Sequence, residues 1–131
     1  MSKYALYLLV FLGSGLGGVV RLALSLVWPE GPYAYAWATL GINVGGCLLI
    51  GLGAQYLMQM QSPVQKAASQ AFLLTGFCGG LTTVSLFSRQ SLAFWENGDV
   101  LAGALYIFAH LLFCPLATFI GSHSTKAMQK G

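Results

Sequence analysis

Four residues with polar or polarisable side chains recur every four positions in the last apolar stretch of the chain: Tyr106, His110, Cys114 and Thr118. Each step of four residues turns an α-helix by about 400°, so the four side chains follow one slowly drifting stripe. Polar groups inside a membrane are costly and usually serve a function, so the stripe predicts the wall of a pore. His110 alone is equally compatible with a core histidine whose hydrogen bonds are satisfied within the protein.

Two further polar residues lie deep in apolar stretches, and each admits two interpretations. Arg21 lies about a turn and a half before the end of the first stretch. It either extends to the membrane interface or attracts anions at a vestibule. Asn43 lies within T-L-G-I-N-V-G-G, where its amide either bonds a neighbouring helix or donates to a passing anion.

Residues 75–88 read T-G-F-C-G-G-L-T-T-V-S-L-F-S, which is unlike a plain membrane helix. The clustered Gly76, Gly79 and Gly80 weaken a helix, and the hydroxyls of Thr82 and Thr83 can bond backbone groups that a break leaves free. Glycine is also common in membrane helices for packing. Its combination with the hydroxyls predicts a third helix broken at mid-membrane, whose bare carbonyls and helix ends form an ion site.

Val84 and Phe87 are three residues apart, and they therefore share a helix face directly after this break. An aromatic ring in a membrane helix ordinarily packs against its neighbours. The positive edge of a phenyl ring can also face an anion. In a dry pore, this contact would replace part of the hydration that the anion loses.

Membrane helices must position these side chains, because the chain is too poor in charge for a soluble fold. Its 131 residues include 6 Lys+Arg and 3 Asp+Glu, so 7% are charged and 56% are hydrophobic, whereas soluble domains carry about 25% charged residues. Four apolar stretches, at about 4–28, 34–60, 67–95 and 100–120, each approach the roughly 20 residues needed to span a bilayer. The linkers are short, so we expect an all-α integral membrane protein with one four-helix transmembrane domain over residues 1–131.

An even number of spans places both chain termini on one side of the membrane. That side carries Lys3, Lys66, Lys126 and Lys130, whereas the other side has only two arginines, both within membrane segments. The difference favours cytoplasmic termini but is weak, so insertion in both orientations stays open.

Several other classes of function lack their sequence signatures. A net charge of +3 without a basic run argues against nucleic acid as a partner. Cys47, Cys78 and Cys114 lie in apolar stretches, and we interpret them as packing residues rather than as disulfide partners or metal ligands. The sequence offers no nucleophile beside a base and no paired carboxylates, so we expect neither an enzyme nor catalytic residues.

Three motifs make the chain resemble the Fluc (CrcB-type) family of fluoride channels, and the resemblance covers nearly its whole length. They are G-L-G-G-V-V-R ending at Arg21, G-I-N-V-G-G around Asn43, and G-F-C-G-G-L-T-T-V-S-L-F-S at 76–88. The third motif is the most specific, because a glycine pair, two threonines and a spaced phenylalanine rarely meet by chance at mid-membrane.

The resemblance implies a passive, fluoride-selective channel subunit that exports cytoplasmic fluoride and protects the cell from its toxicity. It implies a multi-pass protein of the bacterial inner membrane, and an antiparallel, dual-topology dimer with two pores in the lipid bilayer. A structural Na⁺ at the dimer centre would bind the backbone carbonyls of Gly79 and Thr82. Arg21 would lie at a vestibule, and the implied fluoride-pore residues are Asn43, Val84, Ser85, Phe87, Tyr106, His110, Cys114 and Thr118.

The elements expected to face the pore depart from the family's pattern. The third motif usually reads T-T-F-S-T-F-S with an acid two positions later, but this chain has Val84, Leu86 and Gln90 at three of those places. Arg89 is an added charge, and His110 stands where serine or asparagine is usual. The chain would then be either half of a homodimer or, alternatively, the pore-divergent partner of a paralogous subunit in a heterodimer of fixed orientation.

A small four-helix multidrug exporter is a further alternative. Proton-coupled export of cations requires a carboxylate within the membrane, but Glu30, Glu96 and Asp99 all lie at predicted loops. A non-conducting scaffold protein would explain the departures from the family's pattern but not the intact glycine and threonine motif.

Overall fold

The computed structural model describes residues 1–28 and 33–128, with the side chains of 125–128 excepted. Its helical spans Lys3–Leu26, Ala34–Met58, Pro63–Glu96 and Val100–Ser124 are each long and apolar enough to cross a membrane. The predicted all-helical, multi-pass architecture is therefore confirmed. Glu30, Lys126 and Lys130, which the exporter and orientation hypotheses involve, lie outside the described side chains.

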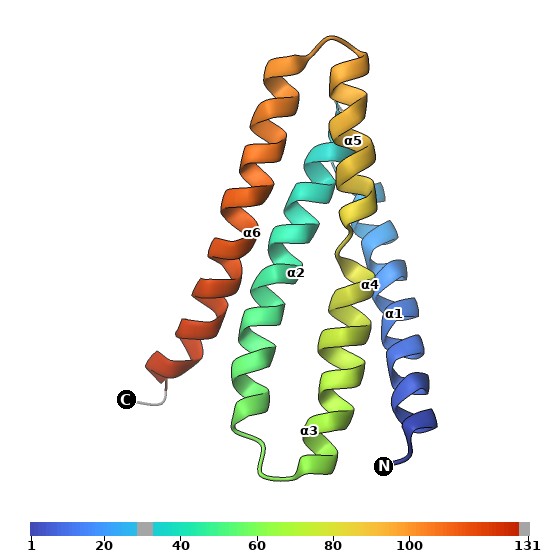
Figure 1. Ribbon diagram of the computed structural model, residues 1–131, viewed down its shortest axis with the longest axis vertical. Helices are drawn as coiled ribbons and strands as arrows, with labels where there is room; N and C mark the ends of the chain where they lie inside the picture. The colour runs from blue at the N-terminus through green and yellow to red at the C-terminus, as the bar shows by residue number, and fades with distance from the viewer. Residues whose placement is uncertain (29–32, 129–131) are drawn as a thin grey trace.

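Three of the spans are single helices: α1 (Lys3–Leu26), α2 (Ala34–Met58) and α6 (Val100–Met128). The third span is made of four segments (Figure 1), and these are α3 (Pro63–Ser69), the π-helical η1 (Gln70–Cys78), the short turn α4 (Gly79–Leu81) and α5 (Val84–Glu96). Figure 1 shows the start of α1 and the end of α6 at the same end of the molecule as α3, as expected for an even number of spans.

The predicted limits of the spans were wrong at several ends. The third span begins at Pro63 rather than at 67, because Ser62 accepts a hydrogen bond from the Gln65 N–H and proline suits the first helical position. The fourth helix continues past Ile120 to Met128, since backbone hydrogen bonding does not end where hydropathy falls. The first and second helices each end two residues earlier than predicted.

Glycines on facing helices let the backbones of α1 and the third span approach closely. A Cβ atom added at Gly13 would overlap the carbonyl oxygen of Phe72, and one at Gly17 would overlap that of Phe77. A Cβ at Gly80 would in turn overlap the backbone of α1. Small residues four apart on both helices are typical of tight packing between membrane helices.

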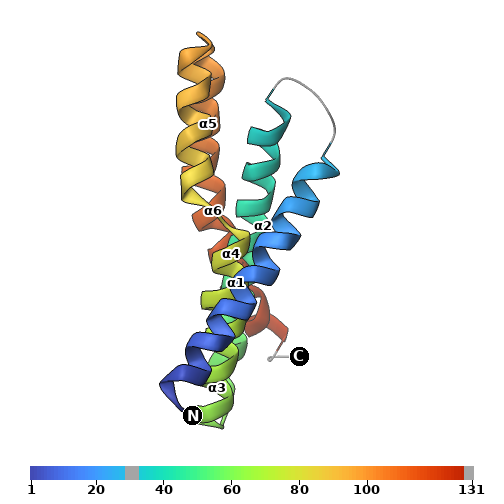
Figure 2. The ribbon, with the colours of Figure 1, turned by 90° about the vertical axis from the view of Figure 1, so that its right-hand side faces the viewer.

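An aromatic cluster joins α2, α5 and α6 at the far end from the termini. Phe94 and Tyr106 are fully buried there, with ring centroids 5.4 Å apart, and both pack against Ala36. Trp37 meets Tyr106 edge to face at 5.8 Å. As a result α5 stays beside α6 and diverges from α1, as Figure 2 shows.

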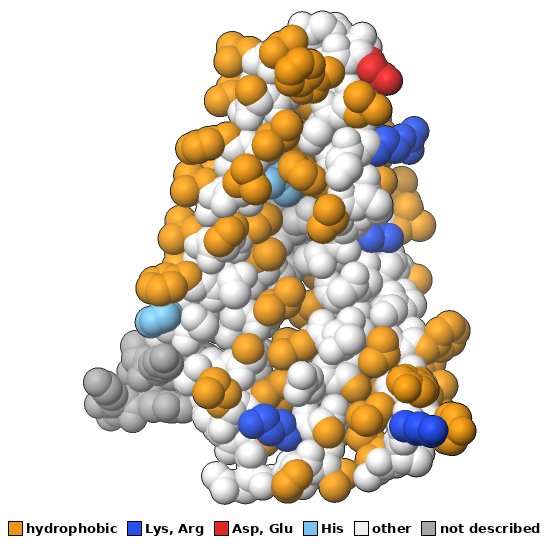
Figure 3. All heavy atoms as spheres, viewed as in Figure 1, with side chains coloured by type: hydrophobic (Ala, Val, Ile, Leu, Met, Phe, Trp, Pro, Cys, Tyr) orange, Lys and Arg blue, Asp and Glu red, His pale blue; other side chains and the backbone are white. Residues whose placement is uncertain are grey.

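Large apolar side chains cover the outside of the chain. Tyr4, Phe11 and Leu101 are each more than 70% exposed, at 71%, 73% and 74%. Figure 3 shows hydrophobic side chains over the whole height of one face. Such a surface is suited to lipid or to another membrane helix, because a soluble protein rarely exposes so large an apolar area.

Candidate ion pathway

The third span leaves helical geometry at Thr82 (φ −82°, ψ 155°) and Thr83 (φ −153°, ψ 121°), between α4 and α5. The side chain of Asn43, on α2, bonds both backbone groups of Thr83. The Thr83 N–H donates to Asn43 Oδ1 at 2.9 Å, and Asn43 Nδ2 donates to the Thr83 carbonyl at 3.1 Å. This pairing gives the Thr83 N–H the acceptor that the interrupted helix does not supply.

Several carbonyls of the third span lose their helical partners at this interruption, and those of Gly79 and Thr82 are among them. A continuous α-helix would direct the Thr83 N–H to the Gly79 carbonyl and the Leu86 N–H to the Thr82 carbonyl, each four residues earlier. Here Asn43 accepts from the Thr83 N–H, and the Thr83 hydroxyl accepts from the Leu86 N–H at 3.3 Å. Gly79 is exposed and Thr82 is half-buried, so both carbonyl-bearing residues lie at the surface of the single chain.

Asn43 also contacts His110 on α6. Asn43 Nδ2 lies 3.3 Å from His110 Nε2, and His110 Nδ1 lies 3.1 Å from the carbonyl oxygen of Tyr106. Because a carbonyl can only accept, Nδ1 carries the hydrogen and Nε2 accepts from Asn43. Both N–H groups of the Asn43 amide therefore form hydrogen bonds within the chain. In this structure Asn43 bonds neighbouring helices, which is the first of the two roles that its sequence position allows.

A groove of ≈360 Å³ lies beside this contact, between α2, α5 and α6. It brings together five of the predicted pore residues with Thr82 and with three residues that the sequence analysis did not assign to it. Cys47 could have been found by its spacing, because it lies one turn after Asn43 on the same face of α2. The lining residues are Asn43, Cys47, Thr82, Thr83, Val84, Phe87, His110, Leu111 and Cys114.

The polar stripe on α6 opens to this groove only in its middle. Tyr106 does not line it, because its ring is fully buried between α2 and α5. The hydroxyl of Thr118 lies 3.2 Å from the carbonyl oxygens of both Cys47 and Cys114, so it bonds α2 instead of lining the groove. His110 and Cys114, between these two ends, are the members of the stripe that reach the groove.

Val84 and Phe87 share the groove, as their spacing predicts. The Phe87 ring lies 4.5 Å from the His110 ring between centroids, whereas Val84 is 77% exposed. Ser85 is exposed outside the groove, with its hydroxyl 3.1 Å from that of Thr83. Arg21 is half-buried on α1 and does not line this groove.

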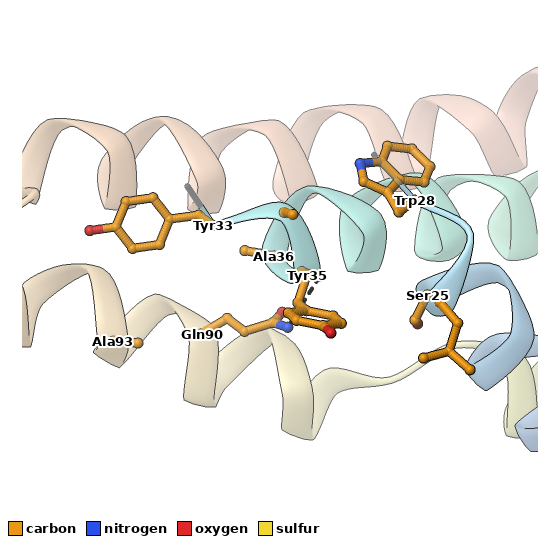
Figure 4. A pocket seen from close by; sticks show the side chains of 9 residues that line it. Ser25, Trp28, Tyr33, Tyr35, Ala36, Gln90 and Ala93 are labelled. Atoms are coloured by element: carbon orange, nitrogen blue, oxygen red, sulfur yellow. Dashed lines mark hydrogen bonds between the residues drawn. The ribbon is translucent and has the colours of Figure 1, made fainter. Parts of the chain in front are cut away.

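A second hollow lies between α1, α2 and α5, where two crevices of ≈490 and ≈360 Å³ share Ser25, Tyr35, Gln90 and Ala93. Figure 4 shows Gln90 extending from α5 toward Tyr35, whose carbonyl accepts from Gln90 Nε2 at 3.3 Å. The Tyr106 hydroxyl donates to Gln90 Oε1 at 2.8 Å. Gln90 therefore links α2, α5 and α6, because its amide can both donate and accept.

Comparison with known proteins places the chain among relatives of similar length. The family model for CrcB-like protein, Camphor Resistance (CrcB), matches residues 8–122. The fluoride-specific ion channel FluC of Paramagnetospirillum magneticum is 40% identical over 116 residues, which cover 88% of this chain and 91% of the relative. The proteins of that name from Rhizobium meliloti (38% identical; 92% and 96% covered) and Azotobacter vinelandii (40% identical; 91% and 95% covered) are similar. The chain therefore belongs to the CrcB family of membrane proteins.

Proposed function

We propose that this chain is a subunit of a passive, fluoride-selective channel that lets fluoride leave the cytoplasm and so limits its toxicity. The observation that carries the proposal is the groove beside the interrupted third span. There Asn43, Phe87 and His110 converge in a chain whose relatives are named as fluoride-specific ion channels. That name also supports the prediction that the chain is not an enzyme.

Fluoride is small and strongly hydrated, so a selective path must replace its water with other donors. The Asn43 amide would donate one N–H to fluoride after the hydrogen bond from that N–H to His110 breaks. The edge of the Phe87 ring would present its partial positive charge to the ion. Arg21 would attract the anion at a vestibule. The ion would move down its own gradient past Val84 and Cys114, which are the other predicted pore residues that line the groove.

We also propose that the Gly79 and Thr82 carbonyls hold a structural Na⁺. In a continuous helix these carbonyls would accept from the Thr83 and Leu86 N–H groups, which here bond Asn43 Oδ1 and the Thr83 hydroxyl instead. Unwound backbone carbonyls in membrane helices are typical ligands of Na⁺. Two carbonyls from one chain leave a cation incompletely coordinated, so a second subunit related by two-fold symmetry would supply two more. When bound, the ion would hold the two interruptions together at mid-membrane.

The partner subunit would pack against the outer face of α1 and α2. These helices border an apolar hollow of ≈700 Å³ in which glycines of α2 are prominent. A Cβ atom added at Gly45 would meet no atom of this chain within 4 Å, which leaves room for another helix. Small residues in such a position favour close helix contact in a membrane. We propose an antiparallel, dual-topology homodimer in the bacterial inner membrane.

A heterodimer with a paralogous subunit is a second candidate, and one observation favours it. Both N–H groups of Asn43 are bonded within the chain, to Thr83 and to His110. A subunit whose anion donor is held in this way would contribute less to conduction than its partner. In that case this chain would be the pore-divergent half of a shared channel.

Fluoride efflux from liposomes tests both candidates, with chloride efflux as the selectivity control. Fast and fluoride-selective efflux from liposomes that contain only this chain would support the homodimeric channel. A folded dimer without flux would contradict it, and recovery of flux on co-reconstitution with a related subunit would support the heterodimer. Absence of flux in both preparations would contradict the proposed function.

A further inference from the structure

We propose that His110 and Asn43 form a proton-dependent site for a small anion. With a neutral imidazole the two side chains bond each other, whereas with an imidazolium both become donors that converge on an anion between them. The ligand class is a small anion that only accepts hydrogen bonds, and fluoride is the candidate. The inference rests on the proposed function for the identity of the anion but not for the geometry of the site.

The contacts of the His110 ring leave its Nε2 atom with one role. Nδ1 donates to the Tyr106 carbonyl at 3.1 Å, and the ring lies against the rings of Phe87 and Tyr106, each with centroids 4.5 Å away. These contacts hold the ring plane, so Nε2 stays directed at Asn43 Nδ2, 3.3 Å away. The neutral ring accepts there, and a proton on Nε2 would turn the acceptor into a second donor.

The Asn43 amide cannot compensate for protonation of His110 Nε2 by flipping its oxygen and nitrogen. Its Oδ1 accepts from the Thr83 N–H and its Nδ2 donates to the Thr83 carbonyl. A flipped amide would set its own N–H against the Thr83 N–H and its oxygen against the Thr83 carbonyl. A protonated His110 and the Asn43 amide would therefore present two N–H groups to the same point, and an acceptor placed there would satisfy both.

Charge balance in the groove also favours joint binding of a proton and an anion. The lining is largely apolar, and neither an isolated imidazolium nor a bare anion is stable in such surroundings. The pair is neutral overall, because His110 gains one proton as the groove gains one negative charge. A small anion needs only a modest separation of the two nitrogens, and the open groove beside them gives room for it.

Among the described residues, His110 is the one group in this groove whose side chain ordinarily changes charge near neutral pH. The groups that face it are Cys47 on α2, Thr83 and Phe87 of the third span, and Tyr106 and Cys114 on α6. Thiols and phenols are already neutral below about pH 8. The described lining contains no Asp, Glu, Lys or Arg side chain. Proton uptake coupled to an anion here would therefore belong to the imidazole of His110.

Nitrogen-15 NMR of the wild-type protein, labelled at histidine, tests the site without any substitution. Fluoride added at a fixed pH of about 7.5, where free histidine is mostly neutral, should convert His110 Nε2 from an unprotonated to a protonated nitrogen. Chloride should not do so, and His123 is an internal control because it is exposed and bonds Phe119 and Ser122 on its own helix, away from the groove. Saturation of the protein with fluoride while His110 Nε2 stays unprotonated would overturn the proposal.

Equilibrium fluoride binding provides a second measurement. If one proton enters with each anion, the affinity should rise about tenfold per pH unit of acidification while His110 is mostly neutral. In His110→Gln, an amide replaces the titrating ring and the affinity should no longer depend on pH. The matched variant His123→Gln should keep the wild-type dependence. An unchanged pH dependence in His110→Gln would overturn the proposal.

The outcomes separate this site from the channel function. Rapid fluoride efflux, with an imidazole that does not respond to fluoride, would overturn the site and leave the channel in place. An imidazole that takes up a proton with fluoride, in liposomes that show no efflux, would support the site and contradict the homodimeric channel.

Discussion

Asn43 and Thr83 pair through one N–H···O bond in each direction, although 40 positions separate them in the chain. The pairing resembles the contact of one peptide unit with its neighbour in a β-sheet. It lets the third span pass through the extended residues Thr82 and Thr83 while the Thr83 N–H keeps an acceptor. The same pairing takes the N–H that would otherwise occupy the Gly79 carbonyl.

Replacing Asn43 with aspartate tests the pairing with almost no change of shape. An ionised carboxylate at this position would still accept from the Thr83 N–H but could not donate to the Thr83 carbonyl, and its charge would be buried in a largely apolar groove. We expect Asn43→Asp to lower the free energy of unfolding by about 3 kcal/mol or more, because the bond to the Thr83 carbonyl is lost and an unpaired charge is buried. Denaturant unfolding in detergent measures this, with the exposed Asn97→Asp as the control. Equal stability of the two variants would count against a structural role for the pair.

Substitution of Gly17 by alanine tests the close approach of α1 to the third span. The added methyl group would overlap the Phe77 carbonyl, so the helices must separate. We expect a loss of about 1–3 kcal/mol or more in the free energy of unfolding. Gly15→Ala is the matched control, because a Cβ atom at Gly15 meets nothing within 4 Å. If thermal unfolding does not distinguish the two variants, the helices do not pack as described.

Gln90→Glu tests the link among α2, α5 and α6. A glutamate carboxylate can accept from the Tyr106 hydroxyl but cannot donate to the Tyr35 carbonyl, which would keep its bond from the Thr39 hydroxyl and lose the link to α5. We expect the free energy of unfolding to fall by roughly 0.5–1.5 kcal/mol, the net contribution of one hydrogen bond. The same change at the exposed Gln65, on α3, should be nearly neutral. A Gln90→Glu variant as stable as Gln65→Glu would show that the link contributes little.

Removal of Na⁺ tests the proposed site at Gly79 and Thr82. Replacing Na⁺ with a large organic cation should shift the wild-type protein from dimer to monomer in detergent, as measured by cross-linking. Gly79→Ala should leave the fold of the single chain intact, because a Cβ atom there meets nothing within 4 Å. The added methyl group should nevertheless crowd the proposed dimer centre and abolish the response to Na⁺. A wild-type dimer that is indifferent to Na⁺ would contradict the site.

The sequence by itself determined the class of the protein and its four spans. Apolar length and scarcity of charge are local properties, so a reader of the sequence can recognise a membrane helix without knowing its neighbours. Spacing was sufficient to place Val84 and Phe87 on one face, because the helical repeat is local as well. Limits of the spans were less accurate, since caps such as Ser62 and backbone bonding beyond the apolar stretch set them.

Only the tertiary structure decided what the polar residues do. The four-residue spacing on α6 could not reveal that Tyr106 lies in an aromatic cluster while His110 reaches the groove. Asn43 contacts Thr83 and His110, which lie 40 and 67 positions away in sequence. Hydrogen bonds between residues so far apart in sequence depend on which faces of two helices meet and at which level along their axes. A helical pattern specifies the face of a residue but not the partner that the neighbouring helix brings to it.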